Sequence, residues 1–428
     1  MRRLFLSAIG LAALAVPAAA MAANPHFDVE SATRAYLDLL QGPARAKSDA
    51  YFEGGYWLTL WGALVVVAVD LILLRGGLSA RFRDWAERIV KRRWLVPALY
   101  AIPYAIASAL LTLPWTIYTG FVREKQYGLL SQGFGAWAGE QATGLAISVV
   151  VNILLLTVLF AVIRRFRRTW WLWGAATMIV FTVIGVLVAP VFIAPLFNKY
   201  TELPGGPVRD KIVAMANANH IPSEHIYLFD ASKQSKRISA NVSGLGPTIR
   251  ISLNDNLLNR TGPDEVAAVM GHEMGHYVLG HIFRLITLLG LIFLGVFGLF
   301  YLLIPAILAR FGGRWGVHDV ADPAVMPLIG MLAAIAGLLL TPLSNTIVRT
   351  EEIEADAFGL DAAREPDGFA KVAMRLSEYR KIEPGPVEEA LFFDHPSGAT
   401  RVRGAMQWKK DHVPGATMVK PDIKLDAQ

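Results

Sequence analysis

The sequence contains no cysteine. The chain can therefore form no disulfide bond, supply no thiolate to a metal ion and use no cysteine nucleophile. Charged residues are also scarce, because they make up 18% of the chain, whereas hydrophobic residues make up 54%. This balance argues against an ordinary soluble enzyme. Basic residues are not interleaved with aromatic residues as they are in nucleic-acid-binding proteins, so no nucleic acid is expected as a partner.

The hydrophobic residues are concentrated in six stretches. Each is long enough to cross a lipid bilayer, which requires about 20 apolar residues in a helix. Any one of them could be a buried helix of a large soluble protein, but six in one chain indicate a polytopic membrane protein. The stretches cover residues 56–74, 95–118, 143–163, 170–195, 284–308 and 324–345.

The N-terminus has the pattern of a signal peptide. A basic start and an apolar run are followed by small residues that end at Ala22. This pattern predicts a signal peptide at residues 1–22 that is cleaved after Ala22. The alternative is an uncleaved first transmembrane helix, which would raise the number of spans from six to seven.

Two short basic loops predict the orientation in the membrane. Residues 75–94 carry seven basic side chains, and "RRFRR" at 164–168 carries four more. Because cytoplasmic loops are enriched in Lys and Arg, both loops are expected in the cytoplasm. Counting spans from these loops places residues 119–142, residues 196–283 and the C-terminal tail on the opposite side. Both interpretations of the N-terminus lead to this result.

The polar stretch after the fourth span has mixed character. Residues 207–220 show helical spacing, whereas 225–230 and 248–255 alternate as strands do, and 239–246 read as a further strand and turn. A small sheet is therefore expected beside the next motif in the chain.

That motif is "MGHEMGHYVLGHI" at residues 270–282, which contains the HExxH pattern. Thr261 and Pro263 are helix-start signals, so the motif is expected inside a helix. Residues four apart lie on one helical face, so His272 and His276 can bind one Zn²⁺ while Glu273 points to the side of the metal. A carboxylate in that position can take a proton from metal-bound water. The alternative is a pair of surface histidines without a metal.

A catalytic zinc site usually has a third protein ligand and an open position. His281 is rejected as this ligand, because five helical residues turn it by about 140° from His276. It is interpreted as a polar residue at the membrane border. Glu352 and Asp356, four apart on a helix expected to continue out of the last span, are better placed. Glu352 is predicted to bind zinc and Asp356 to orient a ligating histidine, although an acidic run can also be a solvated helix face.

Three glycines lie in or beside the motif helix: Gly271, Gly275 and Gly280. Each costs a helix about 1 kcal/mol relative to alanine. Their presence predicts that a neighbouring helix or the substrate approaches this helix closely.

An ordered series of segments resembles the type I CAAX prenyl proteases, a family of integral-membrane zinc endopeptidases. The resemblance covers nearly the whole chain and is more specific than HExxH alone. The matching segments are "LPWTIYTGFVREKQYG" at 113–128, "APLFNKYTELP" at 194–204, "SKRISAN" at 235–241, the HExxH helix, "EEIEADAF" at 351–358 and "DHPSGATR" at 394–401.

The resemblance implies roles for the remaining site residues. One zinc ion per chain would be held by His272, His276 and Glu352, with Glu273 as general base. The loop around Asn241 would lay the substrate backbone along a strand edge. His395 would stabilise the oxyanion, and Asp356 would orient a ligating histidine. Arg349 and Arg401 would support the carboxylates and the His395 loop. Family members enclose a large chamber within a barrel of helices.

Two departures from the family pattern concern the substrate and the location. Residues 239–246, "SANVSGLG", lack the aromatic residues of the eukaryotic "SNAYFYG", which leaves the substrate preference open. The basic loops also place the zinc domain outside the cytoplasm, whereas eukaryotic members face it toward the cytosol. The chain is therefore expected in a bacterial inner membrane with a periplasmic catalytic domain and without prenylated substrates.

These observations predict an α-helical polytopic membrane protein, with six to seven transmembrane helices enclosing a chamber and a small α/β zinc-metalloprotease domain. The predicted function is a membrane-embedded zinc metalloendopeptidase that hydrolyses peptide or protein substrates with zinc-activated water. A membrane metal transporter and a non-catalytic membrane chaperone are the alternatives, and Glu273 argues against the chaperone. The oligomeric state is not predicted. The expected segments are 1–22 (signal peptide or first transmembrane helix), 23–196 (four spans), 197–283 (α/β segment with HExxH), 284–345 (two spans) and 346–428 (third zinc ligand).

Overall fold

The structure is a computed structural model that describes residues 27–244 and 248–425. The expected signal peptide at residues 1–22 lies outside the described residues. In the described part, six helices are long and apolar enough to cross a membrane, and each expected span falls within one of them. With their adjoining turns they are Gly42–Arg75, Arg93–Gln126, Phe134–Arg165, Trp170–Leu196, His281–Trp315 and Pro323–Ala363. Their main α-helices are α2 (Gly42–Arg75), α4 (Val96–Ile117), α6 (Phe134–Arg165), α7 (Trp170–Val188), α11 (His281–Trp315) and α12 (Met326–Ala363).

Short helical turns lengthen two of these helices. A π-helical turn η2 (Tyr118–Val122) and helix α5 (Arg123–Gln126) continue α4. A π-helical turn η3 (Ala189–Ile193) and a 3-10 turn η4 (Ala194–Leu196) continue α7. The apolar faces are largely exposed, since none of the most apolar 18 residues of Trp170–Leu196 is buried in the chain. Such faces suit contact with lipid.

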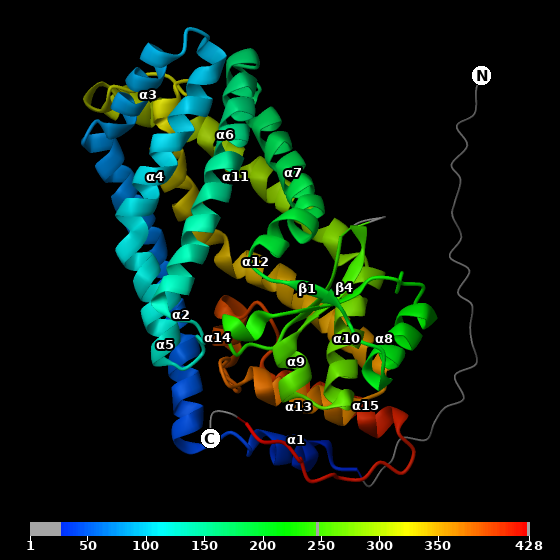
Figure 1. Cartoon of the computed structure of the whole chain (residues 1–428). Coiled ribbons are helices and arrows are strands. Elements are labelled where there is room, and N and C mark those ends of the chain that lie inside the picture. The colour runs from blue at the N-terminus through cyan, green and yellow to red at the C-terminus, as the bar shows by residue number, and fades with distance from the viewer. Residues whose placement is uncertain (1–26, 245–247, 426–428) are drawn as a thin grey trace, which may run out of the picture.

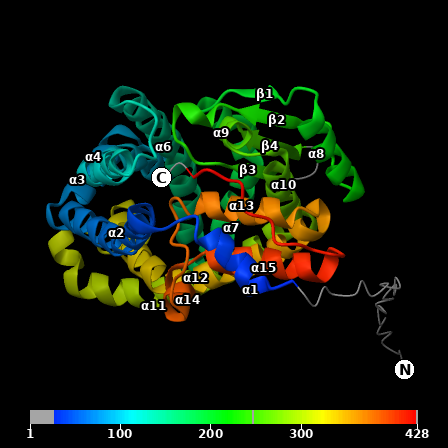
Figure 2. The same ribbon diagram turned by 90° about the horizontal axis from the view of Figure 1, so that it is seen from below.

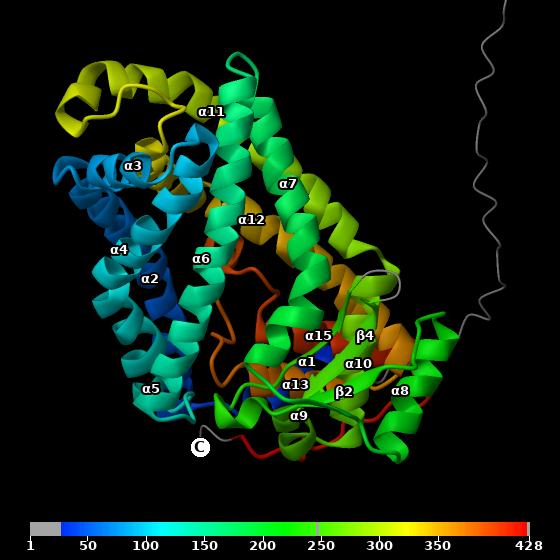
Figure 3. The same cartoon turned by 45° about the horizontal axis from the view of Figure 1, so that its top comes forward.

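The six helices pack together at one end of the molecule. Helix α3 (Leu78–Ile89) and the 3-10 turns η1 (Arg93–Leu95) and η7 (Pro323–Val325) lie at this end. Its core contains fully buried Tyr100, Phe160 and Ile304 from α4, α6 and α11. From this core the helices diverge toward the end that carries the sheet (Figures 1 and 3).

The sheet has four strands in the order β1-β2-β4-β3. Strand β2 pairs in parallel with β4, and the outer strands β1 and β3 pair antiparallel to their neighbours. The small sheet was expected, but β1 was not, because three residues are too few to show an alternating pattern. The strands are β1 (Tyr200–Glu202), β2 (Ile226–Phe229), β3 (Ala240–Ser243) and β4 (Arg250–Asn254).

Helix α10 (Pro263–Val278) carries the HExxH motif and lies between the sheet and α13 (Pro366–Leu376) (Figure 2). It starts one residue later than Thr261 suggested, because Gly262 is the N-cap residue. The Glu265 carboxylate accepts the Gly262 N–H at 2.8 Å, which satisfies a backbone donor that the helix leaves free. Gly280, with φ of 68°, separates α10 from α11.

The C-terminal helices form a second core with the first helix of the described residues. Helix α1 (Val29–Leu37) packs on α13 and on α15 (Gly398–His412), and buries Tyr36 and Leu37 there. Tyr36 donates a hydrogen bond to Asp367 at 2.9 Å. The remaining helices are α8 (Pro207–Ala218), α9 (Asp255–Arg260), α14 (Pro386–Phe392) and the 3-10 turn η5 (Ala231–Lys233).

Candidate metal centre and active site

Helices α10 and α12 touch through glycines on the HExxH helix. A Cβ atom at Gly271 would lie 2.8 Å from the carbonyl oxygen of Gly359, and one at Gly275 would lie 3.1 Å from the Cα atom of Ala355. Both distances are shorter than a carbon atom tolerates without displacement of its neighbours. These two glycines therefore allow the backbones of α10 and α12 to meet. The expectation of close helix packing is met at both positions.

This contact brings together His272 and His276 of α10 and Glu352 of α12. Their ligand atoms all lie within 4.8 Å of one another, and they form a group that could hold a metal ion. The two histidine Nε2 atoms are 3.2 Å apart. Glu352 Oε2 lies 3.3 Å from His272 Nε2, and Glu352 Oε1 lies 3.3 Å from His276 Nε2. The donor set consists of two imidazoles and one carboxylate.

Glu352 Oε2 is a buried oxygen without a hydrogen bond. Two ring nitrogens, of His272 and His395, lie 3.3 and 3.4 Å away, but neither contact has the geometry of a hydrogen bond. A buried carboxylate oxygen that lacks a partner is costly. A cation between the three side chains would satisfy it.

Asp356 and Arg401 hold the other side of His272. The Asp356 carboxylate lies 2.8 Å from His272 Nδ1 and accepts two hydrogen bonds from the Arg401 guanidinium, one of them at 2.9 Å. Burial would lower the pKa of His272, but the neighbouring carboxylates of Asp356 and Glu352 raise that pKa to about 10. A metal ion bound at Nε2 would displace any proton on that atom.

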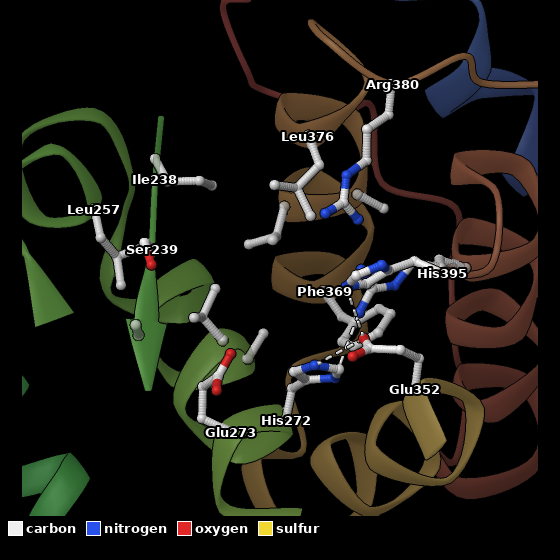
Figure 4. Close-up of a pocket in the computed structure, with 16 residues that line it drawn as sticks. Ile238, Ser239, Leu257, His272, Glu273, Glu352, Phe369, Leu376, Arg380 and His395 are labelled. Atoms are coloured by element: carbon white, nitrogen blue, oxygen red, sulfur yellow. Dashed lines mark hydrogen bonds and ion pairs between the residues drawn. The ribbon is translucent and has the colours of Figure 1, made fainter. Parts of the chain in front are cut away.

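Glu273 is not part of the metal group but lines the pocket beside it. The pocket holds a cavity of about 230 Å³ between α10, the start of β3 and α13. In Figure 4 the Glu273 carboxylate faces this pocket from the same helix as His272. Burial raises the pKa of Glu273, and the charges of His272 and His276 oppose this effect. A carboxylate with a raised pKa is suited to accept a proton.

His395 lies across the pocket from Glu273, on the loop between α14 and α15 (Figure 4). Its Nδ1 atom is 2.8 Å from Asp394 Oδ1, and its Nε2 atom is 3.4 Å from Glu352 Oε2. Arg349 of α12 donates to the backbone oxygens of Glu389 and Phe393, at 2.9 and 2.5 Å, and so holds this loop against α12.

Asn241 lies on β3, one of the two edge strands of the sheet. It is paired with Ser252 of β4. The preceding residues, Ile238, Ser239 and Ala240, line the pocket, whereas Asn241 is the next residue along the strand. The edge of β3 is thus beside the metal group.

His281 lies beside the metal group, whereas the sequence suggested a polar residue at the membrane border. It is buried, with 3% exposure, and its Nδ1 atom lies 2.9 Å from His276 Nδ1. Its Nε2 atom lies 3.2 Å from Glu354 Oε2. The estimate of a 140° rotation assumed one continuous helix, but the left-handed Gly280 ends α10, and α11 turns His281 back toward His276. The glycine before His281 was the available signal of this break.

Known proteins resemble the chain in both sequence and fold. A model of peptidase family M48 matches residues 202–409, and a model of the CAAX prenyl protease N-terminal region, described as five membrane helices, matches residues 36–199. The CAAX prenyl protease 1 homolog of Arabidopsis thaliana is 26% identical, over 83% of this chain and 86% of that protein. The uncharacterized metalloprotease YhfN of Bacillus subtilis is 27% identical, over 78% and 79%.

The crystal structure of Ste24p from S. mikatae has the same fold. It superposes with a TM-score of 0.70 and 21% sequence identity, over 88% of this chain and 96% of that chain. The family-model matches, the metalloprotease relatives and the six apolar helices identify the protein as a multi-pass membrane metalloprotease. The models of peptidase family M48 and of the CAAX prenyl protease N-terminal region together match most of the chain. These matches imply a metal cofactor and peptide substrates, and they do not favour a metal transporter or a non-catalytic chaperone.

Proposed function

We propose that the chain is a zinc endopeptidase whose metal ion is held by His272, His276 and Glu352. The observation that carries the proposal is the spacing of the donor atoms. Tetrahedral zinc with bonds of about 2.0–2.1 Å places neighbouring ligand atoms about 3.3 Å apart. Here the two ring nitrogens are 3.2 Å apart, and each lies 3.3 Å from one oxygen of the Glu352 carboxylate. A zinc ion would also satisfy the buried Glu352 Oε2 atom.

Glu273 is the proposed general base. Bound zinc would supply Lewis acidity toward water and toward the peptide carbonyl. Glu273 stands on the pocket side of the metal group, where its carboxylate can accept the proton of the attacking water. It can then deliver that proton to the amine that leaves as the peptide bond breaks.

The other predicted residues position these groups. Asp356, with Arg401 behind it, fixes the ring of His272 so that Nε2 faces the metal group. His395, oriented by Asp394, faces the pocket and can donate to the oxyanion of the tetrahedral intermediate. Arg349 holds the loop that carries His395. The β3 edge around Asn241 can pair with an extended substrate backbone.

The Glu273→Gln variant tests the proposed function. The variant keeps the size of the side chain and all three ligands but removes the base, so peptide cleavage should fall by about 10²-fold or more. The measurement is the cleavage of a quenched-fluorescent peptide by purified protein in detergent, together with the zinc content. Glu224→Gln, at an exposed loop position, is the matched control. Cleavage retained in Glu273→Gln protein would contradict the assignment.

We also propose that the membrane is a bacterial inner membrane and that the metal centre faces the periplasm. The two basic loops lie at the α3 end of the molecule, opposite the end that carries α10 (Figure 1). The excess of Lys and Arg favours the cytoplasm for the α3 end.

A phosphatase reporter fused after residue 428 tests this orientation, because the enzyme is active only outside the cytoplasm. The fusion should be active, whereas the same reporter inserted after Arg167 should be inactive. The reverse pattern would overturn the proposed orientation while leaving the zinc site unaffected.

The proposed substrates are peptide segments without a prenyl group. The sequence "SANVSGLG" around β3 lacks aromatic side chains, and a periplasmic site would not meet prenylated proteins. Cleavage of one peptide with and without a farnesyl group tests this point. Equal or faster cleavage of the unmodified peptide is expected, and a strict requirement for the lipid would contradict the proposal.

A further inference from the structure

Arg380 projects into the active-site pocket from the turn that follows α13. It lines the same cavity as His272, Glu273 and His395. In Figure 4 its guanidinium group points toward His395, on the wall opposite Ser239 of the edge strand. A substrate chain lying along β3 would therefore pass between the sheet and this cation.

The Arg380 side chain forms no hydrogen bond or ion pair with any residue of the two described stretches of the chain. The other arginine of the pocket, Arg401, is fully engaged with Asp356. Burial alone would lower the pKa of both groups. In Arg401 the charge and hydrogen bonds of Asp356 raise the pKa above its usual value, whereas in Arg380 burial prevails and the pKa is lowered.

The nearby acidic groups are already committed to other partners. Asp394 bonds to His395 at 2.8 Å, Asp356 bonds to Arg401, and Glu352 faces the histidines of the metal group. The positive charge of Arg380 is thus not paired with a carboxylate of the surrounding residues. A partly buried cation of this kind is costly unless something else pairs with it.

The backbone that carries Arg380 is held in place from two sides. The buried Ser48 hydroxyl of α2 donates to the carbonyl oxygens of Ser377 and Arg380, at 2.6 and 3.3 Å. The Ala399 N–H donates to the carbonyl oxygen of Ile382 at 3.0 Å. The guanidinium is therefore presented by a fixed turn, which suits recognition of a ligand more than a mobile surface chain does.

We propose that Arg380 binds a carboxylate of the peptide substrate and directs cleavage to bonds near that group. A guanidinium matches a carboxylate with two parallel hydrogen bonds, which a neutral side chain cannot reproduce. The carboxylate can be the side chain of Asp or Glu, or the free C-terminus of the substrate. This specificity rests on the proposed peptidase function and adds the class of substrate.

Matched peptides and variants test the proposal with the zinc-loaded, full-length enzyme in detergent. The parent peptide is neutral and amidated. One series places a single Glu, or Gln as its control, at successive positions around the cleaved bond, and a second series leaves the C-terminus free. The variants are Arg380→Gln, Arg380→Lys and Arg380→Glu. Arg403→Gln, at an exposed position of α15, is the control.

The native enzyme should cleave the best carboxylate-bearing peptide with a kcat/KM about 10- to 100-fold above that of its neutral partner, as a hydrogen-bonded ion pair provides. Arg380→Gln should abolish this preference by lowering the kcat/KM of the carboxylate-bearing peptide to that of its neutral partner, and Arg380→Lys should keep part of the preference. Arg380→Glu should prefer a peptide with Lys at the same position. The series that shows the effect identifies the source of the carboxylate.

Two results would overturn the proposal. One is a native enzyme that does not distinguish charged from neutral peptides. The other is an equal loss on all peptides in Arg380→Gln, which would indicate a role in catalysis or folding instead. Failure of the native enzyme to cleave any peptide would contradict the proposed peptidase function, and the specificity with it.

Discussion

His281 connects the metal group to a carboxylate on α12. The two Nδ1 atoms of His276 and His281 face each other at 2.9 Å, so one must donate and the other accept. If His276 binds the metal through Nε2, its Nδ1 carries the proton and donates to His281. His281 then carries its proton on Nε2, which faces Glu354 at 3.2 Å. Arg284 holds the same carboxylate. The chain of contacts therefore determines which nitrogen of His276 remains free for the metal.

We expect His281→Ala to weaken metal binding by about 10- to 100-fold, as the loss of a group that orients a ligand usually does. Competition with a chromophoric chelator measures this change. His281→Asn, whose amide can occupy the place of Nδ1, should restore part of the affinity, and Phe283→Ala, at an exposed position of α11, is the control. Unchanged metal affinity in His281→Ala would show that His276 is oriented without it.

The contact between helices α10 and α12 depends on glycines, which have no side chain to hold the two backbones apart. Gly271→Ala would place a methyl group 2.8 Å from the Gly359 carbonyl oxygen. The overpacking should destabilise the protein by about 1–3 kcal/mol, despite the higher helix propensity of alanine. Thermal unfolding in detergent, followed with and without zinc, measures the effect. Gly404→Ala is the matched control, since a Cβ atom there meets nothing within 4 Å; it should leave stability unchanged or raise it.

A stability equal to that of the native protein in Gly271→Ala would mean that α10 and α12 can separate without cost. The ligands on the two helices would then need another source of alignment.

The parts of the site that could be predicted are those that depend on helical spacing. His272 and His276, or Glu352 and Asp356, are four residues apart, so their shared face follows from the geometry of one helix. The six spans were equally predictable, because their apolar composition is local. The contact of His281 with His276 was not predicted because it depends on the turn at Gly280. Arg380 was not predicted because no spacing marks an isolated arginine whose neighbours come from distant helices.

At the scale of the whole molecule, the membrane helices and the catalytic helices support each other. Ser48 of α2 bonds to the turn that carries Arg380, and Tyr56 of α2 donates to Glu388 of α14 at 2.9 Å. Lys381 lies 2.6 Å from Glu53 of α2 and 2.9 Å from Glu388. The turn and loop beside the metal group thus rest on a helix from the N-terminal half of the chain.

A fragment of residues 197–428 is therefore not expected to fold alone. Without α2 it loses these bonds and exposes the face of α12 that packs on α2. Circular dichroism in detergent should show no cooperative melting for the fragment, and co-expression of residues 1–196 should restore both melting and zinc binding. A fragment that melts cooperatively and binds zinc by itself would refute this dependence.

Helix α12 runs without interruption from the cytoplasmic end proposed for the protein to the metal group. Its 38 residues correspond to a length of about 57 Å. Glu352 lies on it, whereas His272 and His276 lie on a helix that does not cross the membrane. A change in the tilt of α12 would therefore move Glu352 relative to the two histidines, and helices adjust their tilt to the thickness of the bilayer. The length of the lipid acyl chains should thus change the geometry of the metal site. We expect zinc affinity in nanodiscs to pass through a maximum as the lipid chains are lengthened.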